Sequence, residues 1–212
     1  MITVHNFAFG PFQENTYILY DETKECIIID PGNTTATEDK KLSDFIVEKQ
    51  LVVKRLILTH GHIDHINGCK YIFDTYGFLP EIHANDVYFV EKHQATATMY
   101  GLACNPSPMP KSLIKEGDVV EFGNSKLNTI HTPGHSPGSI TFYNKEEGFM
   151  IAGDVLFYGS IGRTDLPMGN MDDLIASIKN KLFPLGDTMK VYNGHGNPTT
   201  IGFERLNNPF LV

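Results

Sequence analysis

Thr59-His60-Gly61-His62-Ile63-Asp64-His65 is the stretch of this sequence that decides both the fold and the chemistry. It places three imidazoles and one carboxylate close together at the end of a predicted strand over residues 55–59. A loop at the end of a strand can turn such side chains toward one point, whereas a helix would spread them around its axis. Gly61 gives the backbone freedom to make that turn. The stretch therefore predicts a metal site rather than a solvated polar turn.

Three further donors follow predicted strands in loops flanked by glycine, namely His135, Asp154 and His195. Each one alone could be a turn or capping residue, but their joint pattern favours metal ligands. Together with the first stretch they make seven imidazole and carboxylate donors. Because no cysteine thiolate is needed and a pure oxygen cage is absent, the set suits two divalent ions. Zinc is the first expectation, with iron or manganese as alternatives.

The composition is that of an ordinary globular protein, with 41% hydrophobic and 20% charged residues among 212. The net charge of -8 disfavours nucleic acid as a partner, because that affinity comes from clustered Lys and Arg. No basic-then-apolar leader or long apolar stretch is present, so we expect a cytoplasmic protein with no membrane partner. The three cysteines are odd in number and far apart, which also favours a reducing compartment. The oligomeric state is left open.

Alternating strand-like and helix-like segments predict an α/β fold. Helices are expected at about 36–49, 65–76, 85–99 and 172–182. Strands are expected at 2–9, 15–20, 26–30, 55–59, around 82, 119–122, 127–131, 139–143 and 149–152, with a last strand at 190–193. Because strands and helices occur in both halves, we expect two mixed sheets packed face to face with helices outside. This is a four-layer αββα sandwich, formed by residues 1–212 as a single domain.

The seven donors also resemble, in order, the ligands of the metallo-β-lactamase superfamily, whose His-x-His-x-Asp-His signature matches residues 60–65. The resemblance implies one metal on His60, His62 and His135, and a second on Asp64, His65 and His195. Asp154 would bridge the two together with a hydroxide. A metal pair makes hydroxide available near neutral pH for attack on an acyl carbonyl. Asp64 and Asp154 would be catalytic as well as ligating, because they can orient that nucleophile.

Within the superfamily, the run from Ser160 to Leu166 looks like short glyoxalase II-like enzymes, the hydroxyacylglutathione hydrolases. That resemblance implies hydrolysis of a small-molecule thioester such as S-D-lactoylglutathione, or of an ester. The same Gly-Arg-Thr-Asp run occurs in persulfide dioxygenases, which implies the alternative of one iron near His60, His62, His135 and Asp154, with oxygen as co-substrate. A β-lactamase, a nuclease and a non-enzymatic metal-binding module are less favoured.

Several features bear on the substrate. Only 17 residues follow His195, so we expect no helical C-terminal region with basic residues that grip glutathione. The proline-rich loop from Cys104 to Pro110, or Arg163, could contact a substrate instead. Arg163 and Asp165 are interpreted first as a structural ion pair. The remaining histidines are interpreted as surface or core residues, with His131 the leading exception: His5, His83, His93 and His131.

Overall fold

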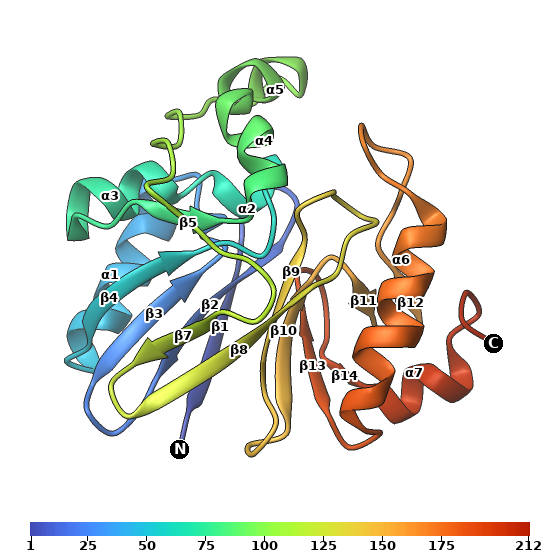
Figure 1. The fold of residues 1–212 in the computed structure, drawn as a ribbon. Helices are drawn as coiled ribbons and strands as arrows, with labels where there is room; N and C mark the ends of the chain where they lie inside the picture. Colours follow the sequence, from blue (N-terminus) through green and yellow to red (C-terminus); the bar gives the residue numbers. More distant parts are fainter.

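A computed structural model describes all residues 1–212 and contains two six-stranded sheets (Figure 1). The first sheet has antiparallel neighbours at one end and parallel neighbours from its third strand onward. Its strands, in spatial order, are β1 (Thr3–Phe9), β2 (Glu14–Tyr20), β3 (Glu25–Ile29), β4 (Val52–Ile57), β5 (Pro80–Ile82) and β6 (Ser112–Leu113).

The second sheet is antiparallel except for one parallel pair in its middle, β10 with β13. Its strands, in spatial order, are β14 (Thr199–Thr200), β13 (Lys190–Asn193), β10 (Phe149–Gly153), β9 (Ile140–Asn144), β8 (Ser125–His131) and β7 (Val119–Phe122). A separate two-stranded hairpin is formed by β11 (Leu156–Phe157) and β12 (Ser160–Ile161).

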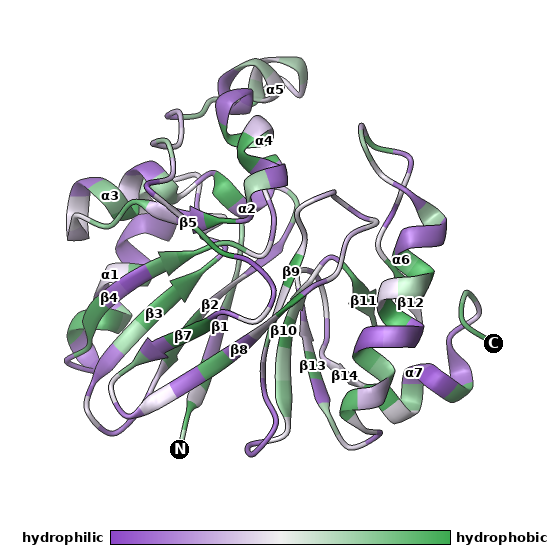
Figure 2. Ribbon diagram, viewed as in Figure 1, coloured by the Kyte–Doolittle hydropathy of each residue, from purple (hydrophilic) through white to green (hydrophobic).

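The alternation of side chains along the strands builds the layers. In β2, Tyr17 and Leu19 point between the sheets and join Phe142 of β9 in one buried cluster, while Ile18 points the other way. The outer faces pack on helices, as Leu42 shows for the first sheet. Apolar side chains on both faces explain why β3 and β4 are hydrophobic along most of their length (Figure 2). The predicted αββα sandwich is confirmed.

Two helical groups cover the outer faces of the sheets (Figure 1). The first sheet carries α1 (Ala36–Glu48) and α3 (Cys69–Tyr76), and the second carries α6 (Met171–Ser177), its π-helical continuation η2 (Ile178–Leu182), η3 (Phe183–Leu185) and α7 (Ile201–Asn207). Thr35 and Glu38 form a capping box that starts α1, which ends within one residue of the predicted position. None of these helices combines the length and the hydrophobicity that a membrane-spanning segment needs.

The helix predicted over 65–76 is wrong in detail, because it is divided into α2 (Ile63–Ile66) and α3. Gly68 lies at the break, where a Cβ would sit 1.9 Å from the Asn33 side chain, so a close tertiary approach sets the division. The expectation of a loop before residue 65 is likewise wrong for Asp64, which lies with His65 on the single turn of α2. One turn is too short to spread them around a helix axis.

The helix predicted over 85–99 is also divided, into η1 (Ala84–Asp86), α4 (Val87–Glu91) and α5 (His93–Met99). These short helices project beyond the sheets on one side of the molecule (Figure 1). The prediction that the strand at 190–193 is the last strand is wrong, because β14 follows it, and α7 comes after β14. Thr200 caps α7 with its side chain, and so short a helix gives little periodic signal in the sequence.

Candidate metal centre

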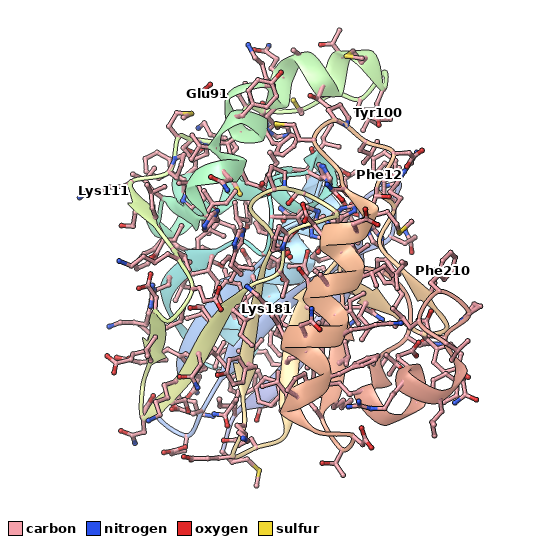
Figure 3. The ribbon with its side chains drawn as sticks, turned by 45° about the vertical axis from the view of Figure 1, so that its right-hand side comes forward. Phe12, Glu91, Tyr100, Lys111, Lys181 and Phe210 are labelled. Carbon is pink, nitrogen blue, oxygen red and sulfur yellow. The ribbon has the colours of Figure 1, made fainter.

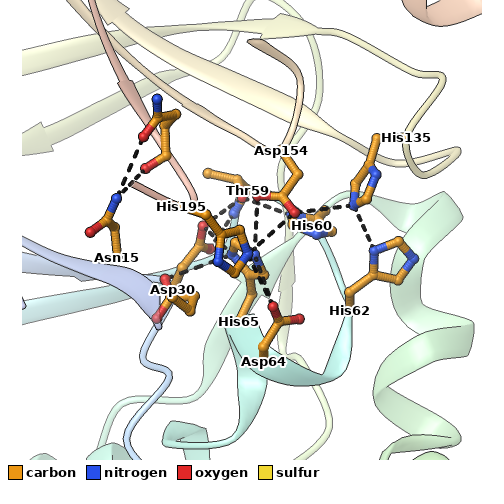
Figure 4. A network of polar contacts seen from close by, with 12 residues as sticks. Asn15, Asp30, Thr59, His60, His62, Asp64, His65, His135, Asp154 and His195 are labelled. Carbon is orange, nitrogen blue, oxygen red and sulfur yellow. Dashed lines mark hydrogen bonds and ion pairs between the residues drawn. The ribbon is translucent and has the colours of Figure 1, made fainter. Parts of the chain in front are cut away.

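The seven donors predicted from the sequence come together where strands of both sheets end (Figure 4). The first four follow β4, Asp154 follows β10, and His195 follows β13. His135 comes from the loop between β8 and β9. Because β10 and β13 are parallel neighbours, their carboxyl ends bring Asp154 and His195 to the same edge of the sheet. Donors more than 130 residues apart in sequence thereby share one site.

Three groups of three possible ligand atoms lie no more than 4.8 Å apart, and two of these groups consist only of donors predicted from the sequence. In the first group, His60, His62 and His135 converge, and Nδ1 of His62 lies 2.8 Å from Nε2 of His135. The second group consists of Asp64, His65 and His195, with His195 Nε2 3.1 Å from Asp64 Oδ2. Each group offers the three-donor set that a divalent ion with an open position requires.

Asp154 lies between the two groups. Its Oδ2 is 3.5 Å from Nε2 of His135 and 3.5 Å from Nε2 of His195, while its Oδ1 is 3.4 Å from Nε2 of His65. The carboxylate therefore contacts histidines of both groups. This position corresponds to the shared role that the sequence resemblance implied for Asp154.

The buried polar atoms of the site fit a metal. Four donor atoms are buried without any hydrogen-bond partner, namely Nε2 of His60, His62 and His65 and Oδ1 of Asp154. Burying several such atoms unpaired costs free energy, so native proteins rarely leave them together without a ligand. Imidazole nitrogens and carboxylate oxygens without thiolate suit zinc, iron or manganese.

Four of the five imidazoles are fixed by a second contact on their Nδ1 atom. His65 donates to Asp30 Oδ2 at 3.0 Å, and His60 lies 3.0 Å from Thr59 Oγ1. His135 and His195 donate to backbone carbonyl oxygens, those of Arg163 at 2.8 Å and Phe12 at 3.1 Å. Such contacts set the tautomer and aim Nε2 into the centre.

Asp30 belongs to this supporting layer, although it also lies near His60 and His65. Its Oδ1 accepts from the Thr59 backbone N–H at 2.7 Å, and its Oδ2 accepts from Thr59 Oγ1 and His65 Nδ1. Both oxygens are therefore occupied by protein donors. The residue adopts a left-handed backbone with φ of 50°, a conformation that favours glycine and marks a constrained position.

Asp86, which the sequence did not single out, links the two loops that carry the first group. This fully buried carboxylate accepts from the backbone N–H groups of Gly61 at 2.8 Å and Gly138 at 2.5 Å, and from Ser136 Oγ at 2.7 Å. A Cβ on Gly61 would lie 2.8 Å from the Asp86 carbonyl oxygen. Close approach to Asp86 is thus a reason for glycine at position 61, beyond the freedom to turn.

Electrostatics differ between the two groups. Burial lowers the pKa of His62 to about 3, with neighbouring His135 adding to the effect, and burial also holds the pKa of His60 well below its usual range. In the second group, burial opposes charge, but Asp154 and Asp64 outweigh it and raise the pKa of His195 to about 10. Carboxylates likewise raise the pKa of buried His65. A metal binding there must displace protons.

The other residues singled out from the sequence lie elsewhere or act differently. Arg163 lines a groove that also contains the donors Asp64 and Asp154. Its guanidinium makes a two-bond ion pair with Asp165 at 2.7 and 2.8 Å, so the predicted ion pair is confirmed. The loop from Cys104 to Pro110 does not line that groove. His131 stacks on His83 at 4.3 Å and donates to the Pro137 carbonyl oxygen, outside both donor groups.

Comparison with known proteins agrees with this fold and donor pattern. The family model described as the metallo-beta-lactamase superfamily matches residues 9–195, and the chain belongs to that superfamily. A relative from Haemophilus influenzae, named hydroxyacylglutathione hydrolase GloC, is 38% identical over 94% of this chain and 93% of its own length.

Two solved structures are similar over nearly their whole length. The BLEG-1 B3 metallo-beta-lactamase is 36% identical, with a TM-score of 0.90 and 100% of both chains covered. TTHA1623, solved in a di-iron-bound form, is 35% identical, with a TM-score of 0.88, covering 98% of this chain and 100% of its own. Relatives named as a hydroxyacylglutathione hydrolase and as a metallo-beta-lactamase are thus both similar to this chain, so the site must decide function.

Proposed function

We propose that this protein hydrolyses small-molecule thioesters or esters with a pair of divalent metal ions. His60, His62 and His135 would hold one ion, and Asp64, His65 and His195 the other, with Asp154 shared. The observation that carries the proposal is the contact of Asp154 with both groups, at 3.5 Å to His135 and to His195. The similarity to the hydroxyacylglutathione hydrolase of Haemophilus influenzae supports a thioester substrate.

When bound, a metal pair supplies hydroxide near neutral pH and polarises the carbonyl oxygen of the substrate. The protein's own groups hold the donors in place, through Asp30, Thr59 and the carbonyl oxygens behind the imidazoles. Asp64 lines the groove and is 17% exposed, so its carboxylate can accept a hydrogen bond from the attacking water. Asp64 and Asp154 are the residues to which we assign roles in catalysis beyond ligation.

Thioester hydrolysis adds water across the C–S bond of the substrate. The water oxygen bonds to the acyl carbon, and the C–S bond electrons leave with sulfur. One water proton ends on the thiol or in solvent, and the other is lost from the carboxylic acid product. A thiol has a pKa of about 8.5, so the leaving group can depart as a thiolate without a proton donor. The site therefore suits a thioester better than an amide.

A persulfide dioxygenase, the alternative from the sequence, needs only one iron. It would leave Asp64, His65 and His195 without a metal, although their ligand atoms converge as closely as those of the first group. The second donor group thus favours the hydrolase. Free cysteines at positions 26, 69 and 104 support a cytoplasmic location as part of the same proposal.

The test is turnover of S-D-lactoylglutathione and of a simple acyl thioester by the zinc-loaded protein and by Asp64→Asn. We expect the variant to lose at least about 100-fold in kcat while its sheets stay folded. Asp74→Asn is the matched control, because Asp74 is an exposed carboxylate on α3 paired with Lys70. Full turnover by Asp64→Asn would contradict the proposed role of that carboxylate.

A further inference from the structure

Five of the seven donors line a groove of about 1080 Å³ whose walls are mostly apolar, namely His62, Asp64, His135, Asp154 and His195. One wall is formed by α4 and α5, which contribute Tyr88, Phe89 and Met99, with Tyr100 directly after them. Phe12, from the turn between β1 and β2, lines the other side. The groove is continuous with the site, because Asp64 and Asp154 line it as well.

The apolar side chains at the mouth of the groove are unusually exposed. Met99 is 86% exposed, Tyr100 52%, Tyr88 49% and Phe12 40%. Phe12 and Tyr100 come from opposite walls and meet with ring centroids 6.0 Å apart at 83°, at the same end of the molecule (Figure 3). An exposed apolar cluster beside a polar centre is typical of a binding site for a partly apolar ligand.

Away from the metal donors, positively charged side chains are scarce in the groove. Lys92 and Arg163 are its only lysine or arginine residues, and Asp165 occupies the guanidinium of Arg163. Lys92 carries the other cation, and its Nζ lies 5.8 Å from the centre of the Tyr88 ring. Glutathione carries two carboxylates and one ammonium group, so Lys92 can pair with only one of its carboxylates, whereas it fully matches a ligand with a single anionic group.

We propose that the groove selects thioesters with an extended apolar acyl group, and that Lys92 binds one anionic group at the end of the acyl chain away from the thioester. This inference rests on the proposed thioester hydrolysis. The acyl chain would lie along Tyr88, Met99 and Tyr100, with its carbonyl carbon at the donor groups. Each methylene buried there should raise kcat/KM by about 2- to 4-fold until the chain reaches the mouth of the groove.

The first experiment uses the zinc-loaded full chain and straight-chain acyl thioesters of N-acetylcysteamine, from acetyl to octanoyl, beside S-D-lactoylglutathione. We expect kcat/KM to rise along the series, and octanoyl to exceed lactoylglutathione by at least tenfold. In the double variant Met99→Ser, Tyr100→Ser, the factor by which each methylene raises kcat/KM should fall toward 1, which is no gain. Leu206→Ser, which removes an exposed leucine on α7 outside the groove, is the matched control and should keep the slope.

The second experiment compares hexanoyl with adipoyl thioesters, which differ by a terminal carboxylate. In Lys92→Gln the adipoyl-to-hexanoyl ratio of kcat/KM should fall about 2- to 5-fold. The ratio should stay unchanged in Lys40→Gln, whose lysine lies on α1 in a pair with Asp44. An unchanged ratio in Lys92→Gln would overturn the role of Lys92.

A binding measurement separates failure of this inference from failure of the proposed function. Calorimetry with non-hydrolysable S-alkyl thioethers of increasing length should show affinity rising with length, in the metal-free and the zinc-loaded protein. If no thioester is cleaved but thioethers bind in that order, the hydrolase proposal fails and the apolar selectivity stands. A flat series, or a preference for lactoylglutathione, would overturn the selectivity while leaving the hydrolase intact.

Discussion

Replacing Asp86 by asparagine should loosen two ligand-bearing loops at once. Its Oδ1 accepts from the Gly138 N–H and its Oδ2 from the Gly61 N–H and Ser136 Oγ. An amide keeps only one accepting oxygen, so in either orientation its NH2 group must face a backbone N–H. At least one of the loops carrying His62 and His135 therefore loses its anchor.

The size of the effect follows from the burial and the bonds of this carboxylate. Losing a hydrogen bond to a charged group costs about 1.5–3 kcal/mol. Burial raises the pKa of Asp86, which means that keeping this carboxylate charged in the folded protein costs free energy. A neutral asparagine avoids that cost, so part of the loss is offset. We expect a net loss of about 1–2 kcal/mol in the free energy of unfolding of the metal-free protein. Asp86→Ala, which orphans all three donors, should lose about 3–5 kcal/mol.

The assay combines urea unfolding with titration by Co²⁺, whose absorption reports each occupied site. Supporting residues of metal ligands are typically worth 10–100-fold in affinity, so Asp86→Asn should weaken one of the two binding steps by about that factor. Asp21→Asn is the matched control. Asp21, in the turn after β2, is also buried and accepts hydrogen bonds from Thr23, Asn124 and Ser125. If both variants bind Co²⁺ alike, Asp86 only stabilises the fold and the reasoning is refuted.

Four more results are expected. With its pKa raised to about 10, the His195 imidazole carries a proton in the metal-free protein at pH 8, and neighbouring carboxylates also raise the pKa of His65. Metal binding should therefore release the His195 proton, seen by calorimetry in buffers of different ionisation enthalpy, and no release would contradict the assignment. The stabilisation that the His195 proton gives the metal-free fold should be complete below pH 6.5 and lost as pH rises through about 10, which urea midpoints across pH would reveal. Asp154→Ala should weaken both binding steps, because Asp154 contacts both groups, and an effect on one step alone would contradict a shared role. Asp165→Asn should leave the urea midpoint unchanged, because the pair with Arg163 is exposed, and a clear shift would show a larger structural role.

The sequence predicts the donors better than the groups that hold them. His60, His62, Asp64 and His65 share one short stretch, and the later donors each follow a strand beside glycine, so spacing alone points to them. Asp30 and Asp86 come from distant segments with no fixed spacing to the histidines. Asp30 at least follows an apolar strand, whereas a backbone carbonyl such as that of Arg163 leaves no trace in residue type.

The fold shows the same division between local and tertiary causes. The helix at 36–48 is predicted to within a residue, because its capping box and periodicity are local. The break between α2 and α3 depends on the approach of Asn33 to Gly68, which no local pattern contains. The groove is likewise out of reach from sequence, because Phe12 and Tyr100 meet there from opposite walls.

The most direct test of the central claim is metal content measured together with turnover in the absence of oxygen. The purified chain should contain about two divalent ions, and it should cleave an acyl thioester under anaerobic conditions. One iron per chain, with turnover only of a persulfide and only with oxygen, would contradict the account.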